Sequence, residues 1–137
     1  MEIRENGITA KEYNYLFDKI GWGSYDSKVS KIALENSLYT VSVYDNNEII
    51  GFGRLIGDGS CYFYIHDVIV LPKYQNKGIG KLIVEKLITK VKKYSKINPY
   101  LRLYLGASFG KEKFYKTCGF ITREEAGLGE GMIYKGF

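Results

Sequence analysis

Histidine and cysteine are scarce in this chain, and that scarcity limits the metal sites it can build. The 137 residues include 1 histidine and 2 cysteines, which excludes zinc sites made of several histidines. Cys61 and Cys118 lie far apart and form no CxxC pair, the spacing of redox and metal motifs. We therefore expect two buried, reduced thiols and no bound metal.

Long apolar runs and linkers are also missing. No segment approaches the ~20 apolar residues of a membrane helix, and residues 1–5 lack the apolar centre of a signal peptide. The chain has 2 prolines and no stretch rich in Ser, Pro and Gly, so no domain boundary is visible. These absences predict a single domain over residues 1–137, in a soluble, cytoplasmic protein with no membrane partner.

An excess of acidic residues is absent as well, since the net charge is +5. A polyphosphate cofactor, a nucleic acid or a need for solubility would each explain that balance. A nucleic-acid binder, however, would carry a dense basic face with aromatic platforms, whereas these lysines are spread along the chain. We therefore expect no nucleic-acid partner.

The hydrophobic pattern that is present predicts strands and helices in a mixed order. Thr9 begins a helix with a capping box, because Glu12 follows three residues later, and Gly21 stops it. Further helices are expected at residues 28–36, 82–91 and 111–117, the first of them with Val29, Ile32 and Ala33 inward. Strands are expected at residues 3–4, 38–44, 48–56, 61–71, 100–105 and 132–135. This order indicates a mixed α/β layer covered by helices on both faces.

The stretch most informative about function lies between the long strand near the middle of the chain and the helix after it. Gly78 and Gly80 remove side chains where the chain turns into that helix. Unpaired N–H groups there would bind an anion such as a pyrophosphate, and Lys77 and Lys81 add positive charge. The sequence does not match the dinucleotide-binding motif GxGxxG, because Ile83 occupies the position of the last glycine. It does not match the Walker motif either, because no GK[ST] follows a Gly-rich loop. Two glycines alone are equally consistent with a plain helix entry.

Two wider motifs resemble the GNAT family of N-acetyltransferases. The first matches the signature Q/R-x-x-G-x-G/A and reads Gln75-Asn76-Lys77-Gly78-Ile79-Gly80. The second, over residues 113–120, is similar to the family's helix ending in FYxxxGF. Their order and separation, and the order of elements from end to end, also resemble the family. The resemblance implies an α/β fold whose mostly antiparallel central sheet is splayed in the middle and flanked by helices on both faces. It also implies an acetyl-CoA-dependent N-acetyltransferase.

The resemblance assigns roles to particular residues. In the family, loop amides clamp the cofactor pyrophosphate, which here implies Gln75, Asn76, Lys77, Gly78, Ile79, Gly80 and Lys81. The preceding strand offers backbone groups to the pantetheine arm and the thioester, which implies Val68, Ile69 and Val70. An amide directed at the thioester oxygen would stabilise its developing charge. Many members also carry an Asn before the final helix, where this chain has Ser108 nearby instead.

The catalytic acid implied by the resemblance is the tyrosine of FYxxxGF, here Tyr115. In the family this tyrosine often protonates the leaving CoA thiolate. A phenol has a pKa of about 10 and a thiol of about 8.5, so the phenol can donate to the thiolate. A core residue without a catalytic role is the alternative interpretation.

The sequence and the resemblance leave more than one interpretation of the catalytic base. Strand alternation places Tyr64, His66, Val68 and Val70 on one face and directs Asp67 to the other, unless a bulge disturbs the count. His66 is the candidate base, because its ordinary pKa suits removal of a proton from an amine near neutral pH. A structural histidine is the alternative, and an amine that loses its proton to water needs no base.

The acceptor amine is the least determined part. The regions that build the acceptor site in the family offer Trp22, Tyr25, Arg54 and Tyr64 as candidate substrate-binding residues, together with Tyr39 and Tyr134. These aromatic side chains favour a small-molecule amine, although a place in the core explains them equally well. The alternatives are a protein lysine or N-terminus as acceptor, and a non-catalytic acyl-CoA-binding module. Homodimers are common in the family, so we also consider a dimer.

Overall fold

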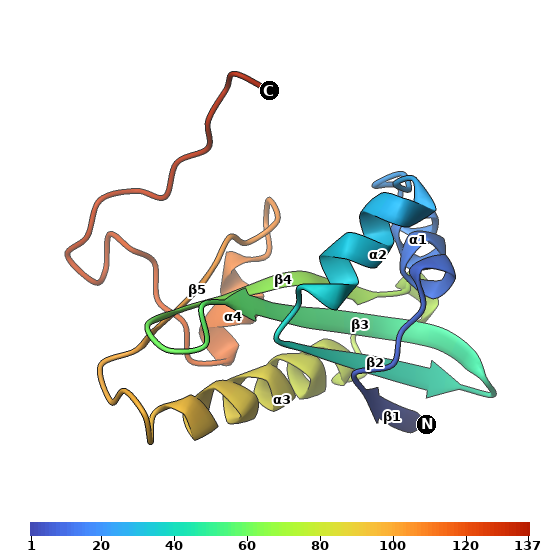
Figure 1. The fold of residues 1–137 in the computed structure, drawn as a ribbon, viewed down its shortest axis with the longest axis horizontal. Coiled ribbons are helices and arrows are strands. Elements are labelled where there is room, and N and C mark those ends of the chain that lie inside the picture. The colour runs from blue at the N-terminus through green and yellow to red at the C-terminus, as the bar shows by residue number, and fades with distance from the viewer. The chain divides into compact units, whose positions relative to one another are not determined.

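The computed structural model describes all of residues 1–137 and divides them into two compact units. The first unit is Met1–Leu105 and the second is Gly106–Phe137. The first unit contains the whole sheet and every α-helix except the last, which can be followed along the chain in Figure 1. That one domain spans both units stays a prediction.

A five-stranded sheet forms the centre of the first unit. Its strands are β1 (Glu2–Glu5), β2 (Tyr39–Asp45), β3 (Glu48–Gly57), β4 (Tyr62–Val70) and β5 (Arg102–Leu105), and they lie in that order across the sheet. All neighbours are antiparallel except β4 and β5, which are parallel. The turn between β2 and β3 places Asn46 and Asn47 at φ 48° and 63°, as a two-residue hairpin requires. The predicted, mostly antiparallel sheet is confirmed.

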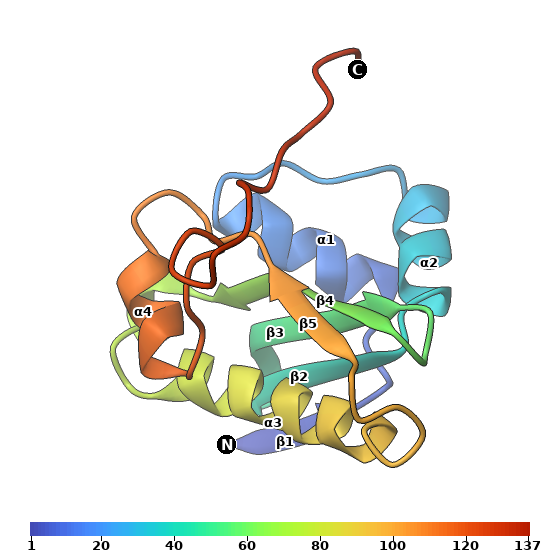
Figure 2. The same ribbon diagram turned by 90° about the vertical axis from the view of Figure 1, so that its left-hand side faces the viewer.

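Helices cover both faces of this sheet. Figures 1 and 2 show α1 (Ala10–Lys19) and α2 (Ser27–Glu35) on one face and α3 (Ile79–Tyr94) on the other. The capping box of α1 forms as predicted: Glu12 N–H donates to Thr9 Oγ1 at 3.1 Å, and Thr9 N–H donates to Glu12 Oε2 at 2.9 Å. Tyr13, Leu16 and Phe17 of α1 are buried against the sheet, so the apolar stripe of this helix supplies one core.

The inward face of α2 differs from the prediction. Val29 and Ile32 are 49% and 62% exposed, and Ser30 is the buried residue of the helix. Ser30 Oγ donates to Asn14 Oδ1 of α1 at 2.6 Å. A polar contact between the two helices therefore sets the rotation of α2, and the prediction from its apolar residues is wrong for Val29 and Ile32. Only Ala33 of the predicted set is partly buried.

The second core lies between α3 and the sheet. Ile79, Ile83, Val84, Leu87 and Val91 of α3 are buried, and each contributes roughly 1.5–3 kcal/mol by burial. A Cβ at Gly53 of β3 would lie 2.6 Å from Ile83 Cγ2, so glycine is what allows the helix to approach the strand this closely.

The second unit contains α4 (Glu112–Thr117), which Gly119 at φ 96° terminates. Lys116 Nζ pairs with Glu125 Oε1 at 2.7 Å within this unit. The predicted strand at residues 132–135 is not present, and Met132 and Ile133 are 92% and 88% exposed. A segment of strand-forming residues becomes a strand only when another strand pairs with its backbone, and no strand of the sheet pairs with this segment.

Two predictions based on scarce residues and missing runs can also be compared with the structure. Both cysteines are free, but Cys61 is exposed and Cys118 only partly buried, so the prediction of two buried thiols is wrong. The helices are all too short or too polar to cross a membrane.

Candidate active site

The sheet opens along β4. Strand β5 pairs with β4 only from Tyr62 to Ile65, where the partners run from Arg102 to Leu105. From His66 to Val70, β4 has no neighbour on that side. The splayed middle of the sheet is therefore confirmed, and it leaves a stretch of strand edge with backbone groups available to a ligand.

A β-bulge interrupts β4 where this open stretch begins. Phe52 pairs with Ile69 and Arg54 with His66, so Gly53 alone faces two residues, Asp67 and Val68. Asp67 has φ 55°, in the left-handed region. A bulge of this kind adds one residue to a strand and shifts its alternation.

The bulge corrects the predicted faces of β4. Ile69 lies in the core with Tyr13 of α1. Asp67 also binds Tyr13 and is therefore on the α1 face, and His66 shares that face because it pairs with Arg54, another partner of Asp67. Val68 approaches the α3 face, 3.7 Å from a Cβ built at Gly53. The prediction that Val68 shares a face with His66, and that Asp67 points away from it, is wrong.

The bulge also decides which backbone groups meet the open side. Leu71 N–H donates to Ile50 O of β3 at 2.9 Å. By the two-residue period of a strand, Ile69 also directs its backbone groups at β3, whereas Val68 and Val70 direct theirs at the open side. Gln75 Nε2 donates to Val70 O at 2.9 Å, which ties the following loop to the end of the strand.

The loop after β4 presents a row of unpaired amides. A short 3-10 turn, Pro72–Tyr74, leads into it, and Gly78 caps α3 with φ 81° and ψ 0°. None of the six successive N–H groups from Asn76 to Lys81 donates to a protein acceptor. The first turn of a 16-residue helix also carries a partial positive charge. These groups fit a pyrophosphate, which accepts several hydrogen bonds at once.

Lysines surround this loop but are not all equally available. The Lys73 and Lys77 ammonium groups lie 4.9 and 5.5 Å from the Tyr74 ring centroid. Lys81 Nζ is 3.9 Å from Glu85 Oε1, and both side chains are more than half exposed. Such surface contacts are weak, so the three ammonium groups keep the loop electropositive.

His66 lies on the α1 face beside the bulge. Its ring stacks on Tyr64 with centroids 5.6 Å apart, and Tyr64 in turn contacts Tyr104 of β5 at 5.4 Å. The His66 side chain is exposed on one side, and the loss of solvent on its other side lowers the pKa of the imidazole. The adjacent Asp67 carboxylate opposes this shift and the Arg54 guanidinium adds to it. His66 is therefore neutral near pH 7 and able to accept a proton.

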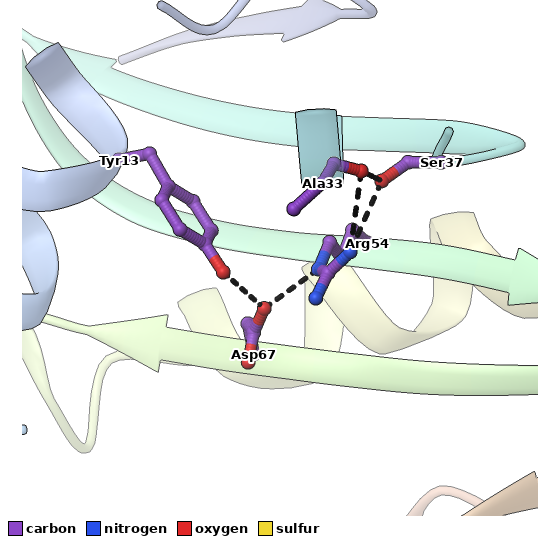
Figure 3. A network of polar contacts seen from close by, with 5 residues as sticks. All are labelled: Tyr13, Ala33, Ser37, Arg54 and Asp67. Carbon is purple, nitrogen blue, oxygen red and sulfur yellow. Dashed lines mark hydrogen bonds and ion pairs between the residues drawn. The ribbon is translucent and has the colours of Figure 1, made fainter. Parts of the chain in front are cut away.

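Asp67 and Arg54 form a partly buried ion pair that the sequence did not reveal. Arg54 Nε lies 2.6 Å from Asp67 Oδ2, and the two side chains are 16% and 15% exposed. The hydroxyl of Tyr13 donates to the same oxygen at 2.7 Å, as Figure 3 shows. Longer contacts of 3.4 Å join Arg54 Nη1 to Ala33 O and Ser37 Oγ. The Arg54 guanidinium is thus engaged within the protein, and its hydrogen bonds connect β3 with β4 and with the end of α2. The Tyr13 bond to Asp67 adds α1 to the same network.

Tyr13 is a residue of this network that sequence reasoning missed. Its helical spacing with Leu16 marks it as core, and it is 1% exposed. Burial and the hydrogen bond to Asp67 both raise the pKa of its phenol, so it stays a donor. No sequence signal links it to Asp67, because the two residues are 54 positions apart.

Two other candidate acceptor residues, Trp22 and Tyr25, lie in the connection between α1 and α2. Trp22 and Tyr25 are 50% and 55% exposed. Both rings contact Phe17, at centroid distances of 5.3 and 5.8 Å. A buried aromatic side chain therefore supports two exposed ones, which leaves aromatic surface available to a ligand.

Tyr115 belongs to the second unit and is partly buried there in α4. Its ring contacts Phe114 and Phe120 at centroid distances of 5.0 and 6.2 Å. Burial raises the pKa of the Tyr115 phenol, and Cys118 raises it further. The phenol is therefore protonated near neutral pH, as a proton donor must be.

Comparisons with known proteins identify the family. Residues 36–122, more than half of the chain, match the family model of the acetyltransferase (GNAT) domain. The chain is 37% identical over 119 residues to an uncharacterized N-acetyltransferase, ycf52, of Gracilaria tenuistipitata, covering 84% of this chain and 63% of that protein. It is 28% identical over 130 residues to the chloroplastic GCN5-related N-acetyltransferase 1 of Arabidopsis thaliana, covering 93% of this chain and 63% of that protein. The chain thus spans less than two thirds of the length of these curated relatives.

A solved structure extends the similarity over nearly the whole chain. The crystal structure of a probable acetyltransferase of unknown function from meticillin-resistant Staphylococcus aureus superposes with a TM-score of 0.84 at 31% identity. The match covers 97% of this chain and 98% of that one. The open β4 edge and the amide-lined loop thus stand in a chain whose fold and sequence agree with one family. The chain belongs to the GNAT acetyltransferase family.

Proposed function

We propose that this protein transfers an acetyl group from acetyl-CoA to a primary amine, by direct attack of the amine on the thioester. One observation carries the proposal: six successive unpaired amides, Asn76 to Lys81, lie at the start of α3, directly after the open edge of β4. An anion-binding loop beside an unpaired strand edge suits a ligand that has a pyrophosphate at one end and amide groups along its arm.

The binding roles follow from the directions of the backbone groups. The loop amides and the Gly78 cap hold the pyrophosphate, and the ammonium groups around the loop add long-range attraction. Val68 and Val70 direct backbone groups to the open side, where they bind the pantetheine arm and orient the acetyl carbonyl. A donor fixed in advance at that oxygen stabilises the charge that develops during attack. Acetyl-CoA itself supplies the activated thioester.

Proton transfer is assigned to two side chains. His66, neutral because burial lowers its pKa, removes the proton that the amine must lose. Tyr115, protonated because burial raises its pKa, returns a proton to the CoA sulfur as the C–S bond breaks. Each group thus has near neutral pH the protonation state that its role needs.

The acceptor we favour is a small-molecule amine with an apolar or aromatic part. Trp22, Tyr25 and Tyr64 are the exposed aromatic side chains that support this choice, at 50%, 55% and 41% exposure. Arg54 is less suited to hold the acceptor, because its guanidinium is already bound to Asp67. A homodimer in the cytoplasm stays a prediction, which gel filtration and localisation of a tagged protein would test.

The proposal is tested by calorimetric titration with acetyl-CoA, followed in the same sample by thiol release with a panel of amines. Gly80→Glu places a carboxylate in the first turn of α3 and should abolish binding by clash and charge repulsion. Thr89→Glu is the matched control, because it adds the same charge to an exposed position of the same helix and should leave binding unchanged.

Each outcome has a distinct meaning. Binding with amine-dependent thiol release supports the proposal, and the best amine begins to define the acceptor. Binding without release from any amine contradicts small-amine transfer and favours a protein acceptor or an acyl-CoA-binding module. If wild-type protein binds no acetyl-CoA, or if Gly80→Glu binds as well as Thr89→Glu, the assignment of the loop is wrong.

A further inference from the structure

The bulge in β4 is a conformation that the local sequence does not favour. Asp67 adopts φ 55°, and an L-residue in the left-handed region pays a steric penalty, although aspartate tolerates it better than most. Contacts outside the strand must therefore hold Asp67 in place. The bulge matters for the site because it decides which of the backbone amides between His66 and Val70 face the open edge.

Two hydrogen bonds converge on the residue at the bulge. Tyr13 Oη donates to Asp67 Oδ2 at 2.7 Å, and Arg54 Nε donates to the same oxygen at 2.6 Å. Figure 3 shows the two donors approaching that oxygen from α1 and from β3. Both side chains are held in turn: Tyr13 is 1% exposed in the core, and Arg54 contacts the end of α2. The carboxylate is thus fixed from two sides by groups that cannot readily move.

A regular strand would present a different site. Without the extra residue, Asp67 would point toward the α3 face, where Ile83 and Leu87 lie near Gly53. The backbone groups of Val68 and Val70 would also turn toward β3, because alternation would continue unshifted from His66. The bulge therefore decides that the backbone amides of Val68 and Val70 face the open edge of β4, and it also sets the surroundings of the His66 ring.

We propose that Tyr13 and Arg54 are positioning residues, which hold Asp67 in the bulge and thereby align the acetyl-transfer site. This inference rests on the proposed function. Neither residue touches the reacting atoms. They act through Asp67 on the backbone amides of Val68 and Val70 at the open edge. They also act on His66, which is the residue of β4 that pairs with Arg54 of β3. Arg54, a candidate for binding the acceptor from the sequence, is reassigned to this role.

The chain offers a matched control for the key hydroxyl. Tyr44 is 2% exposed and lies in the same core cluster as Tyr13. Its hydroxyl donates to Glu12 Oε1 at 3.0 Å, so it too is a buried phenol bound to a carboxylate, but that carboxylate is not the one at the bulge. Tyr13→Phe and Tyr44→Phe each remove one such hydrogen bond and keep the ring.

Kinetics separate a positioning role from a structural one. Tyr13→Phe should lower kcat/KM by about tenfold or more, mainly in kcat, since small misplacements at a reacting site are costly. Tyr44→Phe should stay within about twofold of wild type, although both variants lose a charge-assisted hydrogen bond and some stability. Equal kcat/KM values for the two variants, measured well below their unfolding temperatures, would overturn the proposal.

A second measurement needs no substrate, so it tests the bulge even if the proposed activity fails. His66 is the one histidine of the chain, so its imidazole gives an unambiguous NMR signal. Tyr13→Phe should shift that signal and the amide–α-proton coupling of Asp67, which reports φ, whereas Tyr44→Phe should leave both unchanged. Unaltered His66 and Asp67 signals in Tyr13→Phe would refute the positioning role. Absence of turnover in wild type with shifted signals would refute only the acetyl transfer.

Discussion

Substitution of Gly53 by alanine tests the close approach of α3 to the sheet. A Cβ at this position would lie 2.6 Å from Ile83 Cγ2 and 3.1 Å from Leu87 Cδ1. Ile83 is fully buried, and Cγ2 is attached directly to its branched Cβ, so a stiff χ1 prevents the methyl from moving aside. The helix or the strand must shift instead.

The size of the effect follows from two opposing contributions. Overpacking by a methyl group costs about 1–3 kcal/mol, and the loss of glycine's freedom in the unfolded chain returns about 0.4–1 kcal/mol. The net destabilisation is then about 1–2 kcal/mol. With an unfolding entropy of roughly 2.1 cal/mol/K per residue, a chain of this length loses about 3–7 °C in Tm.

Thermal unfolding followed by circular dichroism provides the assay. Gly106→Ala is the control, because a Cβ there has no atom within 4 Å and should change Tm little. The double variant Gly53→Ala/Ile83→Leu removes the β-branch that clashes and should recover part of the loss. If Gly53→Ala unfolds at the same temperature as Gly106→Ala, the reasoning about this helix–sheet contact is wrong.

Three further predictions concern the site. Gly78→Ala places a methyl group on a residue at φ 81°, which costs about 1–2 kcal/mol, so calorimetry should show acetyl-CoA affinity reduced by about fivefold or more. The pKa of His66 is lowered by burial, so kcat/KM should rise with pH through a midpoint below the ordinary value of about 6.5, and a midpoint above it would exclude His66 as the base. Because the unfolded chain binds that proton more readily than the folded one, acidification below about pH 6.5 should also lower Tm. Tyr115→Phe should reduce kcat by about a hundredfold with unchanged acetyl-CoA affinity in calorimetry, and full activity of this variant would refute the acid role.

Features that depend on neighbouring residues were predictable from the sequence. The capping box of Thr9 and Glu12 forms because three residues of helix bring its partners together. The hairpin turn at Asn46 and Asn47 forms because asparagine tolerates positive φ. Gly78 also occupies the left-handed position that a glycine at a helix entry permits. In each case the interaction is complete within a few residues, so no knowledge of the fold is required.

The interior of the site could not be predicted in this way. Alternation along β4 predicted the shared face of Tyr64 and His66 correctly but failed from Asp67 onward, because the bulge arises from the pairing of β4 with β3 and from a carboxylate held by Tyr13 of α1. The rotation of α2 was likewise decided by the Ser30–Asn14 contact with another helix and not by its apolar residues. The run at residues 132–135 has a strand-like pattern but no partner strand.

The sequence by itself therefore determined every helix and strand except the absent strand at residues 132–135, together with the amide-lined loop and the resemblance to the family, all of which are encoded locally. The tertiary structure decided which side chains of β4 lie on each face of the sheet, where the edge of β4 is open, and how Tyr13, Asp67 and Arg54 form a network. The physical reason is that strand pairing and buried polar contacts join residues far apart in the chain, and their energies depend on geometry that no local pattern contains.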